Sequence, residues 1–374
     1  MNVIFTCGGT AGHINPAIAV ANILKERHPD ASILFIGAKG HMEEKLVPQA
    51  GYKLVTLPGS GLVRGKSLKA ISKNVKVVGD LFGAIKQCKK IIRDFKADVI
   101  VGTGGYASFP ALYAGSSLKI PTCVHESNAL PGLTTKMVAK KASAVMVSFP
   151  ESAKYYPDPA KVQVVGMPVR KEFMLTGRAE ARKQLGLTDE PLVVSAFGSL
   201  GARAMNFAVA DMLKIEQENG FPFRHIHATG SYGWEWMPEH IRSLGVDVDA
   251  CESIDLREYI YDMPTLMAAA DVIIGRAGAS TCNEIGVSGT PAVLIPSPNV
   301  TDNHQEKNAR VLEQHGGAVV LLEGEQMGRR LYDTVTELLA DPNHRSEMSR
   351  ALRELVVMDS AEQICGIIEG FVKA

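Results

Sequence analysis

The chain has 374 residues, of which 40 are basic and 40 are acidic, so its formal net charge is zero. Hydrophobic residues make up 46% and charged residues 21% of the sequence, a composition that is typical of a globular protein and excludes a disordered one. The neutral balance gives no indication of nucleic acid binding, and the length favours two domains, each with a core of its own.

The cysteines and the beginning of the chain indicate a cellular compartment. Six cysteines are scattered without a Cys-x-x-Cys pair, so we expect reduced thiols in a cytoplasm and not a zinc site or a disulfide framework. The chain runs from Met1 directly into a short apolar strand, with no basic leader, and no stretch reaches the roughly 18 apolar residues of a spanning helix. We therefore expect any membrane association to be peripheral.

The first half of the chain alternates short apolar strands with helical segments. We predict strands at 3–7, 32–36, 99–101, 122–125 and 144–148, and the first is followed by a glycine turn at 8–12 and a helix at 16–27. Such alternation is typical of a parallel, doubly wound sheet that is covered by helices on both faces.

The second half repeats this opening. A strand is predicted at 192–197, a glycine turn at 198–201 and a helix at 202–214, and further strands follow at 225–229, 272–275 and 292–296. The segment 164–168, with its Gly and Pro, is the predicted linker. Because open α/β folds bind ligands at the carboxyl ends of their strands, we expect the active site in a cleft between two such domains.

The first glycine turn is a candidate phosphate cradle. Gly8 to Gly12 lies between a strand and a helix, where backbone N–H groups and the helix N-terminus favour an anion, although such glycines can also simply make a sharp turn. His13 follows at the start of the helix. A histidine beside an anion cradle is placed for general-base catalysis, whereas a lone histidine is more often structural.

Two further glycine turns follow strands. Residues 102–107 match the G-x-G-x-x-A form of a dinucleotide fingerprint, but they follow the third or fourth strand and not the first. The only candidate for the acidic residue that binds the ribose about 20 positions further on is Glu126, which belongs to another motif. We interpret it as a second anion-binding turn. The third turn, at 198–202, can hold a diphosphate through Ser199 and the helix N-terminus that follows.

A cluster in the second half predicts contacts to a nucleotide sugar. Residues 278–281 lie between a strand and a helix, and Glu284 is one helical turn further, within reach of a vicinal diol, although an acidic residue near a helix N-terminus is also favoured by the dipole. Residues 302–305 are consistent with an N-cap that presents polar side chains to a sugar. Arg170, which follows the linker, is a better candidate than Arg276 for neutralising a phosphate.

No metal site is predicted. Asp247-Val248-Asp249 has the form of a metal-binding D-x-D motif, but we reject it because the helix-terminus turns already stabilise an anionic leaving group. We expect Trp234 and Trp236 to pack or to cover the surface and not to stack on a sugar.

The segment from Arg64 to Lys96 polarises an otherwise neutral chain, with ten basic residues and only two acidic ones. Apolar residues in it recur at spacings of three and four, which predicts an amphipathic helix whose apolar stripe packs on the sheet: Leu68, Ile71, Val75, Val78, Phe82 and Ile85. Basic residues near an anionic leaflet contribute about 1 kcal/mol each. We therefore expect this segment to bind the anionic inner leaflet of the cell membrane.

In combination, these motifs resemble the MurG family, glycosyltransferase family 28 of the GT-B superfamily. The resemblance runs from residue 3 to about 320 in matching order, and it departs from the family pattern at Ala11, Ser127, Phe197 and 107–109. It rests on the segments 8–17, 104–106, 125–128, 198–203, 276–281 and 302–309. Members of this family add N-acetylglucosamine to lipid I, undecaprenyl-diphosphate-MurNAc-pentapeptide, to make lipid II.

The resemblance implies a GT-B architecture, in which two Rossmann-like, doubly wound domains face each other across a cleft. Residues 1–165 would form an acceptor-binding and membrane-associating domain, and 166–350 a UDP-sugar-binding domain. Residues 351–374 would form a C-terminal helix that returns to the first domain. The reaction implied is an inverting transfer to the MurNAc 4-hydroxyl.

The family's functional residues carry over onto matching positions. His13 matches the proposed catalytic base. Donor contacts are implied for Arg170, Ser199, Ile260, Ala279, Ser280, Thr281, Glu284 and Gln305. Acceptor contacts are implied for Thr10, Ala11, Gly12, Gly104, Gly105, Tyr106, Glu126 and Asn128.

Substrates and partners follow from the same resemblance. UDP-GlcNAc and lipid I are the implied substrates, no tightly bound cofactor is expected, and stimulation by a divalent cation is compatible with the sequence. Cell-wall synthesis proteins are candidate partners, and the cytoplasmic face of the cell membrane is the implied location. Three alternatives stay open: a nicotinamide-dependent dehydrogenase, a transferase with another lipid acceptor such as diacylglycerol, and a non-catalytic nucleotide-sugar-binding protein.

Overall fold

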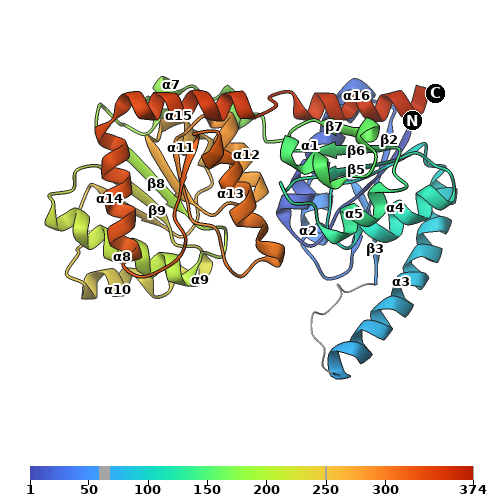
Figure 1. Cartoon of the computed structure of the whole chain (residues 1–374), viewed down its shortest axis with the longest axis horizontal. Coiled ribbons are helices and arrows are strands. Elements are labelled where there is room, and N and C mark those ends of the chain that lie inside the picture. Colours follow the sequence, from blue (N-terminus) through green and yellow to red (C-terminus); the bar gives the residue numbers. More distant parts are fainter. Residues whose placement is uncertain (59–67, 249–250, 374) are drawn as a thin grey trace. The chain divides into compact units, whose positions relative to one another are not determined.

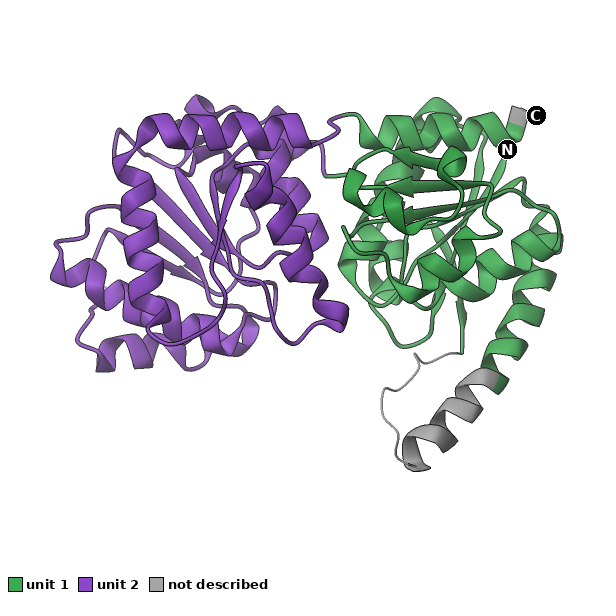
Figure 2. Cartoon of the chain, viewed as in Figure 1, with its two compact units in different colours: residues 1–169, 359–374 green, residues 170–358 purple. Residues whose placement is uncertain are grey.

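The chain folds into two compact units, each built around one parallel sheet. The computed structural model describes residues 1–58, 68–248 and 251–373. Unit 1 comprises residues 1–169 and 359–374, and unit 2 comprises residues 170–358 (Figure 2). In both units, helices connect successive strands and cover the sheet (Figure 1).

Unit 1 has a seven-stranded sheet in the order β3-β2-β1-β4-β5-β6-β7. Its strands are β1 (Asn2–Thr6), β2 (Ser32–Ala38), β3 (Lys53–Leu57), β4 (Val99–Gly102), β5 (Thr122–Glu126), β6 (Ala144–Val147) and β7 (Val162–Val164). Its helices are α1 (Ala11–Arg27), α2 (Glu43–Gln49), α3 (Leu68–Phe95), α4 (Ser108–Ser117), α5 (Leu133–Ala139) and α16 (Ser360–Lys373), with 3-10 turns at Pro150–Tyr155 and Pro159–Lys161.

Unit 2 has a six-stranded sheet in the order β10-β9-β8-β11-β12-β13. Its strands are β8 (Leu192–Ala196), β9 (Arg224–Ala228), β10 (Ile254–Arg257), β11 (Val272–Gly275), β12 (Ala292–Leu294) and β13 (Ala318–Val320). Its helices are α6 (Glu172–Leu175), α7 (Arg178–Gln184), α8 (Arg203–Glu218), α9 (Ser231–Trp234), α10 (Met237–Ser243), α11 (Met263–Ala269), α12 (Ala279–Ser288), α13 (His304–Gln314), α14 (Met327–Ala340) and α15 (Pro342–Leu355), with a 3-10 turn at Thr301–Asn303.

The alternation of residues along β1 explains why helices cover both faces of the first sheet. Val3 and Phe5 pack with α1 and α16 in one core, whereas Ile4 packs with α3, α4 and α5 in the other. All three side chains are fully buried. A central parallel strand that is buried on both sides therefore reads as a continuous apolar run, as it does here.

The chain crosses between the units at 169/170 and at 358/359, and not at 165/166 and 350/351. The expected linker at 164–168 is wrong in its position, because Val164 ends strand β7 and Val165 is buried in the core of unit 1. The second crossing is later than expected because α15 packs on α12 of unit 2.

The C-terminal helix α16 belongs to unit 1, where it packs on α1. Ile364, Cys365 and Ile368 join the same core as Val3 and Phe5. At the edge of this contact, Glu369 accepts hydrogen bonds from Arg27 at 3.3 Å and from the ring of His28 at 2.9 Å.

Helix α3 runs from Leu68 to Phe95 and so contains most of the basic segment predicted at 64–96, of which Arg64 and Lys66 lie outside the described residues. Its expected apolar stripe is wrong at Phe82, which is 70% exposed, because Ala84, Cys88 and Ile92 form the face that packs against the sheet. The side chains of Leu68, Ile71, Val75 and Val78 lie outside the described residues.

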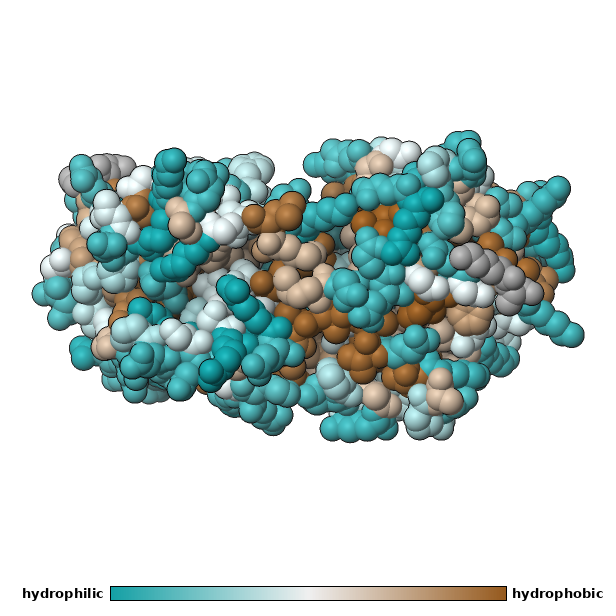
Figure 3. Space-filling model, turned by 90° about the horizontal axis from the view of Figure 1, so that it is seen from above, coloured by the Kyte–Doolittle hydropathy of each residue, from teal (hydrophilic) through white to brown (hydrophobic). Residues whose placement is uncertain are grey.

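The surface mixes polar and apolar residues, as the face drawn in Figure 3 shows. Among the described residues, no helix has both the length and the apolar character that are needed to cross a bilayer.

Candidate active site

Both sheets have a topological switch point, where neighbouring strands send their following helices to opposite faces. In unit 1 this point lies between β1 and β4, and in unit 2 it lies between β8 and β11. The glycine turns predicted from the sequence follow these four strands. Open α/β sheets bind their ligands at the carboxyl ends of such strands.

In unit 1, two glycine turns pack directly against each other. Gly105 has a φ of +82°, and a Cβ there would lie 2.2 Å from the carbonyl oxygen of Gly8. Gly104 has a φ of +111°, and a Cβ there would lie 2.6 Å from Nδ1 of His13. Only glycine permits both the backbone conformation and this close approach.

His13 lies in the first turn of α1, which begins at Ala11 and not at Pro16 as expected, because the helical hydrogen bonds already start from Thr10 O. Its Nδ1 lies 3.2 Å from the carbonyl oxygen of Thr103, and the Thr103 hydroxyl donates to the carbonyl oxygen of His13 at 2.6 Å. A carbonyl can only accept a hydrogen bond, so Nδ1 carries the proton in the neutral ring. The lone pair then resides on Nε2, the form a general base requires.

Glu43, on α2, was not found from the sequence. Its side chain is completely buried, and its carboxylate accepts hydrogen bonds from the backbone N–H of Ala38 at 2.9 Å and of Gly9 at 3.2 Å. A charge with no exposure requires such partners. Glu43 therefore fastens the first glycine turn to the end of β2. No motif surrounds it, so only the fold shows its role.

Tyr106 follows the second glycine turn, and its hydroxyl lies 2.7 Å from Nε2 of His41. Partial burial and the nearby charge of Glu43 raise the pKa of Tyr106, so the phenol stays neutral at physiological pH. His41 was also missed by sequence analysis. It positions a side chain that was predicted to bind the acceptor.

Glu126, another predicted acceptor residue, is buried at the end of β5. One of its oxygens accepts from the backbone N–H and the side-chain amide of Asn128, at 3.0 and 3.1 Å, and the other accepts from Gly132 N–H at 3.0 Å. This carboxylate shapes the loop that follows β5. Direct contact of Glu126 or Asn128 with an acceptor stays a prediction.

In unit 2, helix α12 begins at Ala279, so Ala279, Ser280 and Thr281 form its first turn with N–H groups available to an anion. Glu284 lies one turn further along. Burial raises the pKa of Glu284 to about 7, and the positive charge of Arg170 partly opposes this rise. Arg170 and Glu284 both belong to unit 2 and lie close enough for the charge of Arg170 to lower the pKa of Glu284.

The remaining predicted donor residues also lie in loops at this edge. Ser199 follows β8, and Ile260 is buried in the loop after β10. Gln305 lies in the first turn of α13, and its amide oxygen accepts from Ser297 N–H at 2.9 Å, which leaves the amide N–H₂ to donate. Arg276 is held by Ile295 O at 3.0 Å and by Glu323 at 2.6 Å.

The prediction of an N-cap within 302–305 is wrong in its mechanism. Asn303 occupies the cap position of α13, but it has a φ of 53° and its side chain makes no capping hydrogen bond. Asp302 also has a positive φ, of 54°. Two consecutive left-handed residues therefore start this helix by a tight turn of the backbone.

A buried chain of polar side chains in unit 2 has the form of a catalytic triad but cannot act as one. Ser195 Oγ lies 2.7 Å from His225 Nε2 and 2.7 Å from His227 Nδ1, and His225 Nδ1 lies 2.8 Å from Glu216. All four side chains are fully buried, so no substrate reaches them. Burial and the neighbouring His225 lower the pKa of His227 to about 3, so this ring stays neutral.

Within the described part of the chain, no three His, Cys, Asp or Glu side chains gather in a way that could hold a metal ion. Asp249, the second acidic residue of the D-x-D motif, lies outside the described residues. The two tryptophans lie at the surface of unit 2, where Trp236 packs on Phe207 with ring centres 4.5 Å apart and Trp234 is partly exposed.

The two groups of candidate residues belong to different units, so a shared cleft stays a prediction. Two parallel α/β units, each with a switch point at which open α/β sheets bind ligands, are the architecture of the GT-B fold. Comparisons with known proteins identify the family to which the chain belongs. Residues 3–147 match the glycosyltransferase family 28 N-terminal domain, and residues 192–364 match the family 28 C-terminal domain.

Relatives match the chain over its full length. It is 41% identical over 374 residues, all of this chain and 99% of the relative, to an Acetivibrio thermocellus protein named UDP-N-acetylglucosamine--N-acetylmuramyl-(pentapeptide) pyrophosphoryl-undecaprenol N-acetylglucosamine transferase. A protein of the same name from Thermoanaerobacter sp. is 39% identical over 99% of both chains. The crystal structure of Acinetobacter baumannii MurG matches with a TM-score of 0.76 at 27% identity, covering 99% of each chain. The chain belongs to glycosyltransferase family 28.

Proposed function

We propose that this enzyme transfers N-acetylglucosamine from UDP-GlcNAc to the MurNAc 4-hydroxyl of lipid I, with inversion at the anomeric carbon, and so forms lipid II for peptidoglycan synthesis. The observation that carries the proposal is the full-length match to transferases named for this reaction. Each half of the chain matches one domain of the same family, which supports a complete two-substrate enzyme.

His13 acts as the general base in this proposal. Its Nε2 takes the proton of the acceptor 4-hydroxyl while the hydroxyl oxygen attacks the anomeric carbon and the bond from that carbon to the UDP oxygen breaks. The proton remains on the imidazolium, which Thr103 O steadies through Nδ1–H at 3.2 Å. General-base assistance of this kind is typically worth about 10² to 10⁴ in rate.

Unit 2 holds the donor and its leaving group. The N–H groups of α12 at Ala279 to Thr281, together with Ser199 and Arg170, stabilise the charge that develops on UDP. Glu284 accepts hydrogen bonds from the ribose hydroxyls, and the loop at Ile260 receives the uracil. Gln305 binds sugar hydroxyls through the amide nitrogen that Ser297 leaves unoccupied.

The test is transfer from radiolabelled UDP-GlcNAc, UDP-Glc and UDP-Gal to a short-chain lipid I analogue. We expect selective transfer from UDP-GlcNAc, with a rate at least 10²-fold lower in His13→Ala and unchanged in the control His344→Ala, an exposed residue on α15. Donor hydrolysis without transfer would reject lipid I as the acceptor. Near-normal turnover of His13→Ala with an unchanged pH profile would reject His13 as the base.

The location at the cytoplasmic face of the cell membrane rests on the basic segment that ends α3. In its described part, Lys86, Lys90, Arg93 and Lys96 are exposed, and the exposed ring of Phe82 lies one helical turn before Lys86. Cationic side chains next to an apolar side chain suit an anionic phospholipid surface. Binding to cell-wall synthesis proteins stays a prediction.

Co-sedimentation with liposomes tests this surface. We expect binding to vesicles of anionic phospholipid that weakens with added salt and that falls when Lys86, Lys90 and Arg93 are changed to Glu. Sedimentation that depends on neither anionic lipid nor salt would reject the proposal.

A further inference from the structure

A second cavity lies in unit 2, at the edge of the sheet opposite to the candidate donor residues. Its volume is about 1020 Å³, and its lining includes Asp271 and Pro291, which directly precede β11 and β12. These residues mark the amino ends of the strands, whereas the donor residues follow the carboxyl ends. The cavity is therefore separate from the donor site.

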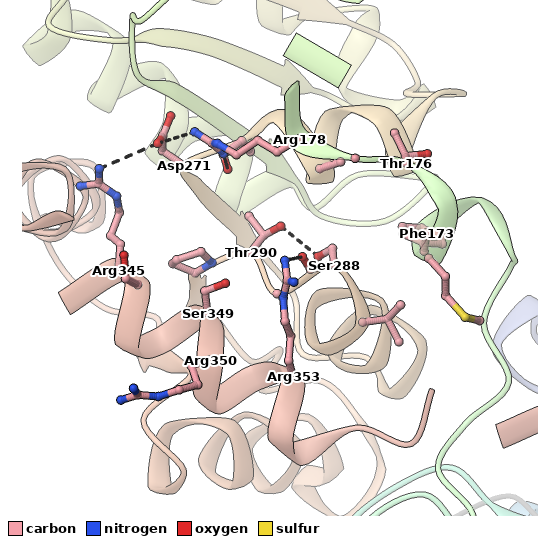
Figure 4. Close-up of a pocket in the computed structure, with 18 of the residues that line it drawn as sticks. Phe173, Thr176, Arg178, Asp271, Ser288, Thr290, Arg345, Ser349, Arg350 and Arg353 are labelled. Carbon is pink, nitrogen blue, oxygen red and sulfur yellow. Dashed lines mark hydrogen bonds and ion pairs between the residues drawn. The ribbon is translucent and has the colours of Figure 1, made fainter. Parts of the chain in front are cut away.

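Four arginines from two helices line this cavity (Figure 4). Two of them are engaged by the protein itself. Arg178, on α7, donates to the carbonyl oxygens of Ala269 and Ala270 at 3.0 and 2.7 Å and pairs with Asp271 at 2.8 Å. Arg345, on α15, donates to the carbonyl oxygens at the end of α14, at 2.6 Å each, and is 3.9 Å from Asp271.

The other two arginines keep most of their donors. Arg353 makes one 3.3 Å hydrogen bond, to Ser288 O at the end of α12, and Arg350 has no hydrogen-bond or ion-pair partner among the described residues. The hydroxyl of Ser349, which directly precedes Arg350 on α15, is likewise without a partner among the residues the structure describes. Ser349 and Arg353 lie one helical turn apart on the face of α15 that is directed toward Ser288 and Thr290, and Arg350 extends from an adjacent face of the same helix (Figure 4).

The absence of a side chain at Gly289 makes room for the side chains of Arg353 and Ser349. It has a φ of +68°, and a Cβ there would lie 2.3 Å from Nε of Arg353 and 3.1 Å from the hydroxyl oxygen of Ser349. The glycine that ends α12 therefore lets the Arg353 side chain lie directly against the backbone. The Arg353 side chain stays exposed at the cavity, and this contact places its stem against the end of α12.

The charges that line the cavity do not balance. Four arginines face two carboxylates, Asp271 and Glu354, and Asp271 is already shared among Arg178, Arg345 and a third arginine, Arg182, at 3.5 Å. Guanidinium groups form paired hydrogen bonds with phosphate and carboxylate groups. The volume lies at the upper end of the roughly 300–1000 Å³ that small-molecule sites occupy.

We propose that this cavity binds a small molecule that carries two or more negative charges, and that Ser349, Arg350 and Arg353 hold it. Its charged groups are phosphates or carboxylates. Arg178 and Arg345 shape the site by holding helix ends together, and they stay with their protein partners. The site is independent of the transfer reaction.

Calorimetric titration of the full chain tests this proposal with two probes, inorganic pyrophosphate and citrate. Saturating UDP fills the donor site throughout, and ionic strength is held constant. We expect at least one probe to bind saturably and to bind at least tenfold more weakly to Arg350→Glu. That variant removes no hydrogen bond or ion pair among the described residues, so it should fold normally, and a normal unfolding midpoint verifies this. The probe that binds more tightly distinguishes a phosphate site from a carboxylate site.

The control is Arg329→Glu, which makes the same charge change on the exposed surface of α14, away from the cavity. Its affinity for the probe should equal that of the unaltered protein. Absence of saturable binding by both probes would overturn the proposal. An equal loss of affinity in Arg329→Glu and Arg350→Glu would overturn it too, because the effect would then come from net charge alone.

Discussion

Replacing Glu43 by alanine should damage the acceptor half of the enzyme while leaving the donor half intact. The change removes a fully buried carboxylate and leaves the N–H groups of Ala38 and Gly9 without their acceptor. A buried donor without a partner costs about 1–3 kcal/mol, so the buried N–H of Ala38 accounts for about that much lost stability in unit 1, and the half-buried N–H of Gly9 adds a smaller cost. The first glycine turn, released from β2, would no longer hold His13 in place. A displacement of about 1 Å typically lowers a catalytic rate about 10²-fold.

Three measurements on Glu43→Ala separate these effects: the thermal unfolding midpoint, kcat for transfer, and the dissociation constant for UDP. We expect the unfolding midpoint and kcat to fall and the dissociation constant for UDP to stay unchanged, because the proposed UDP site lies in unit 2. Glu43→Gln should also be impaired, since its amide N–H₂ would face one of the two backbone N–H groups. Glu44→Ala, an exposed neighbour on the same helix, is the control. An unfolding midpoint and a kcat equal to those of the unaltered enzyme would refute the role of Glu43.

Three further predictions follow from the structure. The pKa of Glu284 is about 7, and in the proposed function the ribose hydroxyls donate to its ionised form, so affinity for UDP should rise roughly tenfold from pH 6 to pH 8. Glu284→Gln should lose this rise, and an identical pH dependence in enzyme and variant would contradict the assignment. The pKa of His227 is about 3 in the folded state against 6.5 when unfolded, so the unfolded chain binds more protons as the pH falls below 6.5. Stability should therefore drop by about 2 kcal/mol from pH 7 to pH 5, and His227→Leu should reduce this slope in unfolding titrations. If the slope persisted in the variant, other groups would be its cause. Gly105→Ala should lower both the unfolding midpoint and kcat, because its Cβ would lie 2.2 Å from the carbonyl oxygen of Gly8 at a φ of +82°. The control Gly132→Ala has no atom within 4 Å of the new Cβ and should behave like the unaltered enzyme.

The sequence predicts the doubly wound class because its central strands are buried on both faces and so read as apolar runs. Edge strands cannot be predicted in this way, because they are not buried on both faces. Strand β3 contains exposed Lys53 beside half-buried residues, and β7 has only three residues, two of them exposed. Neither strand was predicted, and the predicted linker at 164–168 begins at the last residue of β7. Its neighbour β6 supplies the pairing that makes it a strand, and pairing is a property of the fold and not of the segment.

Residues of the candidate site could be predicted where they stand within or next to a short sequence motif. His13 and Glu284 stand beside glycine turns, which mark the carboxyl ends of strands in the sequence. Glu43 and His41 could not be found in this way, because each acts on a turn more than 30 residues away along the chain and no local pattern surrounds it. Their roles depend on how β2 and α2 bring them next to the glycine turns.

The chain enters unit 2 once and leaves it once, so residues 170–358 form an uninterrupted insertion within unit 1, which is assembled from both ends of the polypeptide. Both termini consequently belong to unit 1, and a fusion partner at either end is attached to that unit. A single uninterrupted gene segment encodes unit 2, whereas expression of unit 1 alone requires residue 169 to be joined to residue 359. Recombination at two junctions would therefore exchange unit 2 as a whole and leave unit 1 with its own core and its own C-terminal helix.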